Sequence, residues 1–494
     1  LAVRRARPRT WITALVILIG LACAPIAADA SADAGPYGAI DQLIVPAIDR
    51  PVLDRQDAQR ARWGQPARFA MRHPVTVTPW SHGTWDALDG GGWVWRLRVR
   101  LAESLSADAL GWLPTGGDVR ALEDASLGFA FGRFQLPAGA RLSLHALDGA
   151  RASLGPYTRA DEDDHGQLWT PPIDATDVLI ALTLPARALD PIADGRGLAL
   201  HLASIQRGYV PLGTPAARGG SCNVDLACAV AADWRDLARA VALITVDGVT
   251  SCTGVLLNNT RGDGRPLLLT ARHCGVRVDN AASVVVLWNH RASVCRRHLA
   301  GDDDLSRALD RLDEPHLGRR PHRDVQTGAR LLADDPRTDL ALLELDDPPT
   351  TAGGAVYAGW DARLSASPPW VATVHHPNGD GQRWSRSDRT PRAAGYLDSP
   401  VADAVHASHL RVAAWHLGTT EGGSSGAPLF DPAGRVLGAL QGGHAACGAA
   451  APDWFGRLAA FWDGPTPERR LRDWLDPLDR AGVRTLSPWF APTR

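Results

Sequence analysis

The sequence predicts a chain built mostly from β-strands joined by turns. Glycine occurs 49 times and proline 36 times among the 494 residues, and both residue types end strands and form turns. Short runs in which apolar and polar residues alternate recur along the chain, as in residues 95–101 and 198–205. Every cysteine except Cys23 lies after Arg218, so the chain divides into a cysteine-free part and a cysteine-containing part.

The N-terminus has the pattern of an export signal. Four arginines between residues 4 and 9 precede an apolar stretch, residues 11–24, that is too short to span a bilayer comfortably. Small residues then recur at Ala28 and Ala30, as signal-peptide cleavage requires. We therefore expect residues 1–30 to be a signal peptide and the protein to be secreted, by way of the periplasm. A lipoprotein signal centred on Cys23 is the alternative, and residues 20–22 match it poorly.

Residues 31–218 are expected to form a small antiparallel β-sandwich. Residues 95–101, 141–146 and 198–205 have the alternation of strands, and turn signals such as Pro137-Ala138-Gly139-Ala140 separate them. By itself such a region could be an adhesion or sugar-binding module. Residues 211–222 follow, and their proline and glycine content favours an exposed, extended segment that is open to proteolysis.

The part of the chain after residue 240 again has the pattern of short strands and turns. Apolar runs at 240–246, 283–288 and 436–440 predict strands. The spacing of apolar residues in 467–475 predicts a helix that closes this part of the chain. Residues 301–324 are polar and charge-rich, which is typical of a surface loop.

Three side chains in this part are candidates for nucleophilic catalysis. His273 follows an apolar strand, Asp339 opens another, and Ser425 stands in a turn of small residues. A serine hydroxyl needs a base within hydrogen-bond reach, and that base needs a third group to fix its tautomer. The order His, Asp, Ser is that of a chymotrypsin-type triad. We therefore predict a serine endopeptidase with Ser425 as nucleophile, His273 as general base and then acid, and Asp339 as the orienting carboxylate.

The turn around the serine also supplies an expected oxyanion hole. Gly423 lies two residues before Ser425, and the backbone N–H groups of these two residues would stabilise the tetrahedral intermediate. Ala427 stands where the nucleophile elbow of α/β-hydrolases needs a second glycine. An esterase of that fold is therefore disfavoured. Other carboxylates could replace Asp339 in the triad: Asp334, Asp335 and Asp346.

Composition and cysteine usage limit the partners. The formal net charge is −2, which argues against nucleic acid or an anionic membrane as the main partner. Six cysteines remain after Cys23 leaves with the signal. In an exported chain they indicate three disulfides, whose pairing spacing alone cannot decide. No Cys-x2-Cys motif suggests zinc, and the acidic run 302–304 is more typical of a solvated loop than of a calcium site. We expect no metal and no cofactor.

The second half of the chain resembles the bacterial lysyl endopeptidase family, within the trypsin-like serine proteases. The resemblance covers about residues 220–477 and lies in separate short motifs: 221–225, 252–254, 257–260, 269–275, 358–361, 375–378 and 473–477. It implies that residues 219–494 form two six-stranded antiparallel β-barrels with the active site in the cleft between them. It also implies the disulfides Cys222–Cys447, Cys228–Cys295 and Cys252–Cys274. Residues 31–218 more loosely resemble the propeptide of that family.

The resemblance also implies a pocket for a basic side chain before the scissile bond (the P1 position). Asp453 would lie at its base and pair with lysine or arginine, and Leu440, Gln441 and Gly442 would form its substrate-binding wall. A solvated loop aspartate is the alternative for Asp453. Gln441 stands where lysine-selective members have a histidine stacked on a tryptophan, and Tyr396 stands near the expected place of that tryptophan. All 52 basic residues are arginine, so a self-processing precursor would have to accept arginine, with Arg218 as the junction. Cleavage of the junction by another protease is the competing explanation.

Ser424 is a further departure from the pattern of ordinary trypsins. In trypsins the residue before the nucleophile is an aspartate, which pairs with the new N-terminus on activation. We expect control by the N-terminal domain instead, with the propeptide acting as intramolecular chaperone or inhibitor of a monomeric enzyme. The expected partners are protein and peptide substrates. We expect no association with a membrane after the signal is removed. Two rival functions are a non-catalytic homologue that acts as a secreted binding module, and a protease with acidic P1 preference. Asp453 disfavours the latter, because like charges would be buried together.

Overall fold

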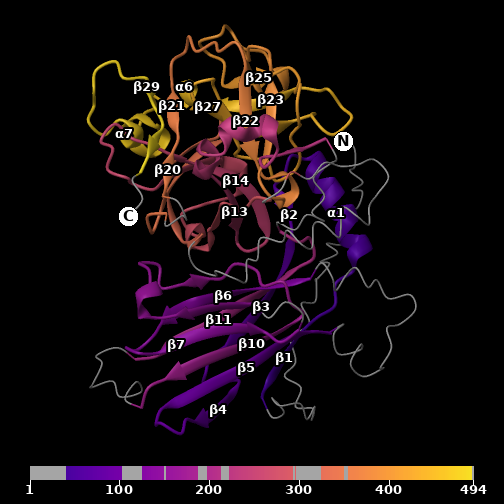
Figure 1. Ribbon diagram of the computed structural model, residues 1–494, viewed down its shortest axis with the longest axis vertical. Coiled ribbons are helices and arrows are strands. Elements are labelled where there is room, and N and C mark those ends of the chain that lie inside the picture. Colours follow the sequence, from indigo (N-terminus) through magenta and orange to yellow (C-terminus); the bar gives the residue numbers. More distant parts are fainter. Residues whose placement is uncertain are drawn as a thin grey trace, which may run out of the picture.

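The computed structural model describes residues 40–102, 125–148, 152–186, 197–212, 222–292, 295, 324–349 and 354–491. The expected signal peptide, the junction at Arg218 and the acidic run 302–304 lie outside these ranges. Figure 1 shows two parts, with the sheets of residues 40–212 below and those of residues 222–491 above. Most regular structure in both parts is β-strand, as the sequence predicts.

The N-terminal part consists of two sheets that share one core. The larger has the order β1-β5-β10-β7-β8 with β4 beside β5, and the smaller β3-β11-β6-β9. Trp95 and Leu97 from the first and Phe129 and Phe131 from the second belong to one buried cluster, which is the packing of a β-sandwich. The strands are β1 (Gln42–Val45), β3 (Ala70–Val77), β4 (Thr84–Ala87), β5 (Trp93–Leu101), β6 (Ser126–Gln135), β7 (Arg141–Ala146), β8 (Ser153–Tyr157), β9 (Leu168–Trp169), β10 (Asp177–Leu184) and β11 (Ala199–Gly208).

One segment of the N-terminal part leaves the sandwich and lies along the upper part of the molecule (Figure 1). It contains α1 (Arg50–Arg62) and β2 (Ala67–Arg68). Helix α1 begins at Asp49, whose carboxylate accepts the Val52 N–H at 3.0 Å, and a proline in its first turn suits that position. Leu53 is its one buried residue. Strand β2 pairs antiparallel with β14 (Thr250–Leu257) of the other part.

The C-terminal part contains two large sheets. The first has the order β17-β16-β13-β14-β15-β19-β18, with β2 added at β14; the second has the order β12-β23-β22-β26-β27-β28-β25-β24, with β21 and β29 off that path. Residues from both sheets, including Leu257, Leu269, Trp384 and Phe430, share one buried cluster. The strands are β12 (Val224–Asp225), β13 (Val241–Val246), β15 (Leu267–Ala271), β16 (Val285–Trp288), β17 (Val325–Thr327), β18 (Ala329–Asp335), β19 (Leu340–Leu345), β20 (Val356–Tyr357), β21 (Gly359–Asp361), β22 (Val371–His375), β23 (Arg383–Ser387), β24 (Arg392–Ala394), β25 (His409–Val412), β26 (Pro428–Phe430), β27 (Arg435–Gly443), β28 (Asp453–Arg457), β29 (Thr485–Leu486) and β30 (Trp489–Phe490).

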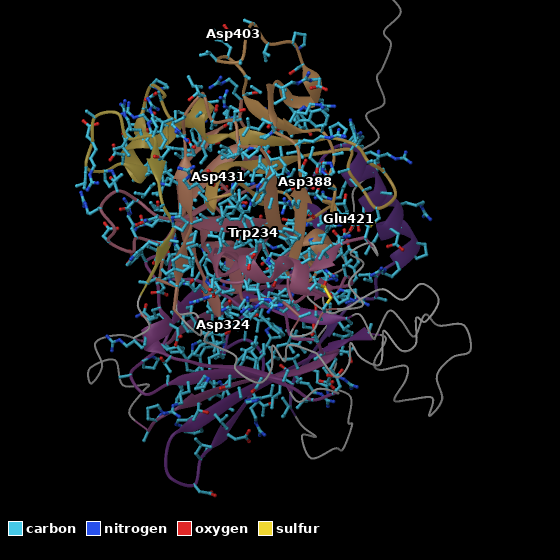
Figure 2. All side chains as sticks on the ribbon, turned by 45° about the horizontal axis from the view of Figure 1, so that its top comes forward. Trp234, Asp324, Asp388, Asp403, Glu421 and Asp431 are labelled. Atoms are coloured by element: carbon cyan, nitrogen blue, oxygen red, sulfur yellow. A yellow bond between two sulfur atoms is a disulfide. The ribbon has the colours of Figure 1, made fainter. Side chains whose placement is uncertain are left out.

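Helices in the C-terminal part are short. They are the 3₁₀ helices η2 (Ala229–Trp234), η3 (Leu237–Ala240), η4 (Arg272–Cys274), η5 (Ala281–Ser283), η6 (Pro377–Gly379), η7 (Tyr396–Asp398) and η8 (Pro467–Arg469), with the α-helices α6 (Leu458–Phe461) and α7 (Arg472–Leu475). The N-terminal part adds η1 (Arg159–Asp161). Trp234, labelled in Figure 2, closes η2 and packs against three aromatic rings, those of Trp370, Trp384 and Phe430. Within the described ranges, no helix has the length and apolar character needed to cross a membrane.

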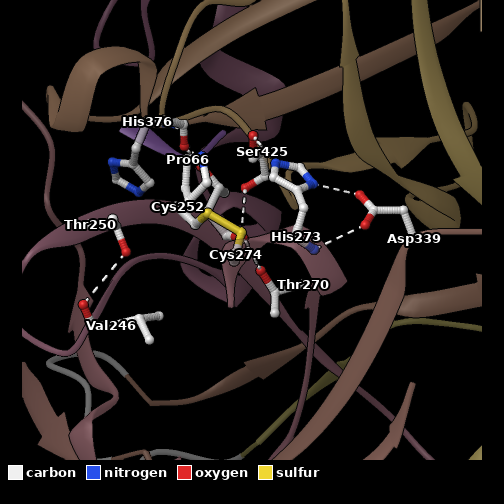
Figure 3. Close-up of a disulfide and its surroundings, with 12 residues drawn as sticks. Pro66, Val246, Thr250, Cys252, Thr270, His273, Cys274, Asp339, His376 and Ser425 are labelled. Atoms are coloured by element: carbon white, nitrogen blue, oxygen red, sulfur yellow. Dashed lines mark hydrogen bonds and ion pairs between the residues drawn. A yellow bond between two sulfur atoms is a disulfide. The ribbon is translucent and has the colours of Figure 1, made fainter. Parts of the chain in front are cut away.

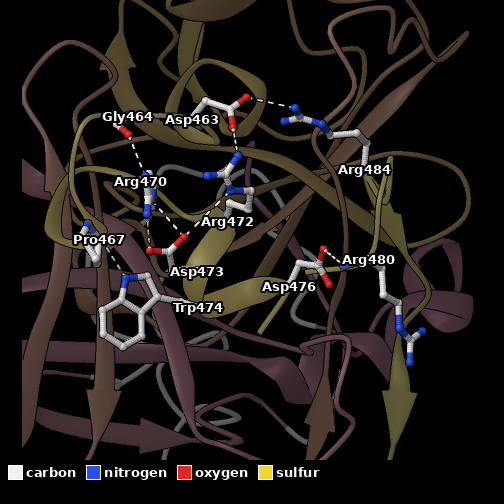
Figure 4. Close-up of polar contacts among 10 residues, drawn as sticks. All are labelled: Asp463, Gly464, Pro467, Arg470, Arg472, Asp473, Trp474, Asp476, Arg480 and Arg484. Carbon is white, nitrogen blue, oxygen red and sulfur yellow. Dashed lines mark hydrogen bonds and ion pairs between the residues drawn. The ribbon is translucent and has the colours of Figure 1, made fainter. Parts of the chain in front are cut away.

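The prediction of a continuous helix over residues 467–475 is wrong. The segment forms η8 and the four-residue α7, separated by Arg470 in an extended conformation. Side-chain contacts hold this break, as Figure 4 shows: Arg470 pairs with Asp473 at 2.8 Å, and the Trp474 indole donates to the Pro467 carbonyl at 2.9 Å. After α7 the chain continues into β29 and β30, so short strands rather than a helix close this part.

Candidate active site

His273 lies at the end of a buried strand, in a position fixed by covalent and polar contacts. Strand β15 runs directly into η4, and Gly275 closes the turn with φ +87°, a conformation that favours glycine. The neighbouring Cys274 is disulfide-bonded to Cys252 on β14, so the histidine turn is tied to the adjacent strand. The Thr270 hydroxyl donates to the Thr253 carbonyl at 2.8 Å and joins the same two strands.

Asp339 holds the imidazole at two points. It lies in the turn between β18 and β19 with φ +57°, a left-handed conformation that is uncommon for a non-glycine residue and often marks a functional site. Its Oδ2 is 2.5 Å from His273 Nδ1, and its Oδ1 accepts the His273 backbone N–H at 2.9 Å. The alternative carboxylates contact other groups: Asp334 pairs with Arg272 and Arg469, Asp335 accepts from Thr338, and Asp346 pairs with His165.

Ser425 completes a line of hydrogen bonds that Figure 3 shows beside the disulfide. Its Oγ is 2.8 Å from His273 Nε2. The structure therefore brings together all three predicted residues, in the order serine, histidine, aspartate. The imidazole stands between the hydroxyl and the carboxylate, which is the geometry needed to remove a proton from Oγ and to stabilise the resulting imidazolium.

The turn before Ser425 has the backbone conformation that an oxyanion hole needs. The Ser424 N–H donates to the Glu421 carbonyl at 3.0 Å, and Gly423 has φ +87°, as the third residue of a type II turn does. A Cβ on Gly423 would lie 2.8 Å from the His376 carbonyl oxygen, so only glycine fits. The Gly422 carbonyl accepts the Asn378 N–H at 2.5 Å. Because C=O and N–H point in opposite directions across a trans peptide, this bond fixes the direction of the Gly423 N–H.

Ser424 belongs to a buried polar network under this turn. Its Oγ lies 2.8 Å from His375 Nδ1 and accepts the Glu421 N–H at 3.2 Å. The other ring nitrogen of His375 lies 3.1 Å from the Ser385 hydroxyl. Burial, with the positive charge of Arg383 as a smaller cause, lowers the pKa of His375 to about 3. The network under the oxyanion turn is therefore neutral at physiological pH.

A cavity of about 590 Å³ opens beside Ser425, and Asp453 lines it. The Asp453 side chain is 1% exposed. Its Oδ2 accepts hydrogen bonds from Thr420 Oγ1 at 2.5 Å and from the Trp415 indole at 2.7 Å, and the Ala445 backbone N–H also interacts with the carboxylate. Burial raises the pKa of Asp453, and the bonds from Thr420 and Trp415 oppose that rise. A solvated loop aspartate, the alternative weighed from the sequence, does not fit this burial.

The three predicted wall residues lie on β27 and also line the cavity. Both backbone groups of Leu440 are bonded within the chain, its N–H to the Ala427 carbonyl at 2.9 Å and its carbonyl to the Gly426 N–H at 2.8 Å. Leu440 therefore anchors the serine loop. The Gln441 side-chain oxygen lies 2.6 Å from His409 Nε2, and a Cβ on Gly442 would lie 3.6 Å from the Tyr396 hydroxyl.

The structure contains three disulfides, Cys222–Cys447, Cys228–Cys295 and Cys252–Cys274. These are the three pairs that the family resemblance implies. Each closes a loop and so lowers the entropy of the unfolded chain, by an amount typically worth about 2–4 kcal/mol. No group of three or more metal-ligating side chains occurs within the described ranges.

Several residues at the site escaped the sequence analysis. Thr420 and Trp415, which orient Asp453, lie on a different loop with no motif to mark them. His409 comes from β25 and packs against the Tyr396 ring, with ring centroids 5.4 Å apart. The least expected lining residues belong to the N-terminal part: the cavity is also bordered by residues 64–69.

Comparison with known proteins agrees with this geometry. Residues 216–456 match the family described as "Lysyl endopeptidase, C-terminal domain". A lysyl endopeptidase of Pseudomonas aeruginosa is 28% identical over 394 residues, which cover 74% of each chain. Residues 216–456 are therefore similar to the C-terminal domain of lysyl endopeptidases, and these similarities indicate a serine protease. The match to the Pseudomonas protein extends beyond the cysteine-containing part.

Solved structures give weaker similarities. A protease from M. tuberculosis in its active form is 17% identical, covers 46% of this chain and 78% of its own, and has a TM-score of 0.26. A serine endoprotease from Yersinia pestis is 16% identical, covers 46% of this chain and 61% of its own, and has a TM-score of 0.28. At TM-scores this low, the two structures add nothing to the family assignment.

Proposed function

We propose that the chain is the precursor of a secreted serine endopeptidase that hydrolyses peptide bonds after basic residues. The observation that carries this proposal is the position of the buried Asp453 carboxylate in the same cavity as the Ser425 hydroxyl. A basic side chain that enters the cavity to reach Asp453 brings the carbonyl after it to the nucleophile.

The mechanism follows from the three hydrogen-bonded groups. Ser425 Oγ attacks the carbonyl carbon while His273 Nε2 takes its proton, and Asp339 keeps the other ring nitrogen protonated and stabilises the imidazolium. The negative oxygen that forms is bound by the N–H groups of Gly423 and Ser425. His273 then gives its proton to the leaving amine, and the acyl-enzyme remains. Water, activated by the same imidazole, hydrolyses the ester and restores Ser425.

The pocket chemistry supports a cationic substrate side chain. Asp453 is a buried carboxylate, and such a group gains strongly from a charge-assisted hydrogen bond to a cation. Gly443 lies directly against the carboxylate, since a Cβ there would lie 2.3 Å from Asp453 Oδ1. A substrate with an acidic side chain would place two negative charges in one buried site, which is unfavourable.

We further propose that the pocket accepts arginine as well as lysine. Gln441 is neutral and its side-chain oxygen is engaged by His409, so no additional positive charge from position 441 faces the substrate. Arginine has a planar fork that needs more lateral room than an ammonium group, and glycines 442 and 443 border the cavity. The absence of lysine from the chain and the arginine at 218 support self-release by cleavage after arginine.

The remaining assignments are part of the same proposal. Residues 1–30 direct export, residues 31–218 are a propeptide, and residues 219–494 form the protease, which works as a monomer without metal or cofactor. The two large sheets of the C-terminal part correspond to the two β-barrels of trypsin-like proteases, with β2 as a strand added from the propeptide. Three disulfides fit an oxidising compartment outside the cytoplasm.

A peptide library tests the function directly. The mature protease is incubated with peptides of mixed sequence, and mass spectrometry of the new ends gives the P1 profile. We expect cleavage after arginine and lysine, and none with the Ser425→Ala protein. Cleavage after lysine alone would refute arginine acceptance, and no cleavage by a folded mature protein would favour the non-catalytic binding module.

A further inference from the structure

A short piece of the N-terminal part lies at the active site itself. Pro66 and Ala67 line the same cavity as Ser425 and Gly422. The Cβ of Ala67 lies 3.8 Å from the position of a Cβ on Gly422, in the turn that forms the oxyanion hole. Figure 3 shows Pro66 drawn among the residues around Ser425 and His376. Helix α1 and β2 are thus not only packed against the outer surface of the protease part.

The direction of this segment is that of a substrate after the scissile bond. Strand β2 is antiparallel to β14, with Ala67 opposite Ser251 and Arg68 opposite Thr250. Two residues further along β14, the Thr253 N–H donates to the Ser425 carbonyl at 2.8 Å. Because the two strands are antiparallel, the chain comes closer to Ser425 from Ala67 back to Pro66, and it moves away from Ser425 after Ala67.

The side of the cleft identifies which half of a substrate is imitated. The disulfide Cys252–Cys274 ties β14 to the turn of His273, and His273 is the group that gives a proton to the leaving amine. Asp453, which would hold the residue before the scissile bond, is on a strand of the other sheet. The edge of β14 therefore borders the leaving-group half of the groove, where backbone pairing with an extended peptide is the expected mode of binding.

Several contacts hold the segment in this place. The Pro66 carbonyl accepts a hydrogen bond from Arg60 Nη2 at 3.1 Å, and the Phe69 N–H donates to the Val249 carbonyl at 2.9 Å. Arg68 pairs with Asp57 of α1 at 2.8 Å, and its Nε donates to the Tyr209 hydroxyl at 2.8 Å.

The segment is also anchored by apolar burial. Phe69 is 3% exposed and packs in a cluster that contains Trp169 and Leu212 of the N-terminal part and Leu243 and Leu287 of the protease part. Because the anchor and β2 are adjacent in sequence, the position of Phe69 fixes how far β2 can reach along β14.

The same segment is unsuited to hydrolysis. The residue before Pro66 is Gln65, which is exposed and carries no charge to pair with Asp453. Pro66 has no N–H and a fixed φ, so the bond before it lacks the features of a good substrate.

We propose that residues 65–69 are a built-in inhibitor strand, which occupies the leaving-group half of the substrate groove and leaves the Asp453 pocket empty. The proposal rests on the proposed function of the protease part and adds its regulation. It identifies residues 249–251, at the start of β14, as the surface through which the N-terminal part acts. Once the junction is cut, the N-terminal part remains a bound inhibitor until β2 leaves β14.

The test uses the full chain with Arg218→Gln, so that it stays uncut, and two matched substitutions. Ala67→Glu adds bulk beside Gly422 and a negative charge near Glu421, which lines the same cavity and lies on the side facing α1 in Figure 2. Ala58→Glu makes the same change at an exposed position of α1. Two probes are compared: p-aminobenzamidine, which needs only the Asp453 pocket, and a quenched fluorescent peptide that extends on both sides of an arginine.

We expect p-aminobenzamidine to bind all three uncut proteins equally. Ala67→Glu should raise the kcat/KM of the uncut chain for the peptide by at least about tenfold, equivalent to about 1.4 kcal/mol of lost inhibitor binding. Ala58→Glu should leave it unchanged. If Ala67→Glu leaves the uncut chain as inactive as before while the mature protease is active, the inhibitor strand is refuted. If the folded mature protease is itself inactive, the proposed function fails instead.

A second variant tests the direction of the strand. Gln65→Arg with Pro66→Ser converts the segment into a substrate, so a cut between residues 65 and 66 is expected. The cut should be absent when Ser425→Ala is added. A free peptide of the altered sequence serves as control: if it is cleaved but the chain is not, the substrate-like placement of residues 65–69 is wrong.

Discussion

Replacing Asp453 with asparagine separates the role of this carboxylate in recognition from any role in folding. Asparagine has nearly the same shape, and its carbonyl oxygen can accept the hydrogen bonds from Thr420 and Trp415 that Oδ2 now accepts. The substitution therefore removes the negative charge and leaves the pocket wall in place.

The size of the effect follows from the burial of the site. Asp453 is 1% exposed, so a cationic substrate side chain that reaches it forms a desolvated ion pair. Removing one partner of such a pair costs about 3–5 kcal/mol. At about 1.4 kcal/mol per factor of ten, kcat/KM for substrates with arginine or lysine at P1 should fall about 10²–10⁴-fold. Substrates with an uncharged P1 residue should lose much less.

The effect on stability has the opposite sign. Burial raises the pKa of Asp453 in the folded protein. The stabilisation linked to its protonated form is fully present below the ordinary value of 3.8 and is lost as the pH rises through the raised pKa. Above 3.8 the wild type progressively loses that stabilisation as the pH rises, whereas asparagine is neutral at every pH. Asp453→Asn should therefore melt at the same or a higher temperature than wild type at pH 7.

The assay combines both measurements. Steady-state kinetics with matched peptides that differ only at P1 give the change in specificity, and thermal unfolding at pH 7 gives the change in stability. A loss of activity that is equal for basic and uncharged P1 residues would refute the pocket assignment. So would a loss that is accompanied by a marked fall in melting temperature, because Asp453 would then be a structural residue.

Four further outcomes are expected. Asp339→Asn should lower kcat by about 10³–10⁴-fold with little change in KM, as single-turnover and steady-state rates would show. Gly443→Ala, which places a Cβ 2.3 Å from Asp453 Oδ1, should destabilise the protease by about 1–3 kcal/mol in denaturant titrations. Ser424→Ala should lower kcat more than it raises KM, because it removes two hydrogen bonds under the oxyanion turn. Burial raises the pKa of both Asp163 and Asp346, which carry charges near His165 and Arg330 where the two parts meet. The cut N-terminal part should therefore be bound most tightly below pH 3.8 and released more readily as the pH rises through the raised pKa values. Size-exclusion chromatography at a series of pH values would show this, and the pH dependence of release should be weaker in the Asp163→Asn control.

The sequence was sufficient where a function depends on short, local motifs. His273 follows a strand and Asp339 precedes one that the local apolar runs predict, Ser425 stands in a turn of small residues, and the chain order indicated how the three meet. Strands such as β7 and β13 were predicted almost to their bounds, because alternation and apolar runs are local signals.

The features that the sequence did not reveal are set by contacts between distant segments. Helix α1 has one buried residue, so it lacks the apolar periodicity from which helices are predicted. Strand β2 has two residues, and it exists only because the edge of β14 is there to pair with it. The helix expected at 467–475 failed for a related reason: the buried Leu471 and Leu475 give helical spacing, but the Arg470–Asp473 pair and the Trp474–Pro467 bond hold a broken conformation.

The uncut chain combines a hydrogen-bonded Ser425–His273–Asp339 group with a segment, residues 64–69, that lines the same cavity. In trypsins, the aspartate before the nucleophile is stabilised by the N-terminus that activation creates. Here the buried Ser424 bonds to His375, whose pKa is lowered to about 3 by burial, so no buried charge at this position awaits a partner. The oxyanion turn and the Ser425–His273 bond are accordingly present with the N-terminal part attached. If the uncut chain is inactive, as the inhibitor-strand proposal requires, the cause is blocked access to the groove, where β2 lies. Cutting the junction does not itself move β2, so the proposal makes the release of this strand from β14 the step that switches the enzyme on.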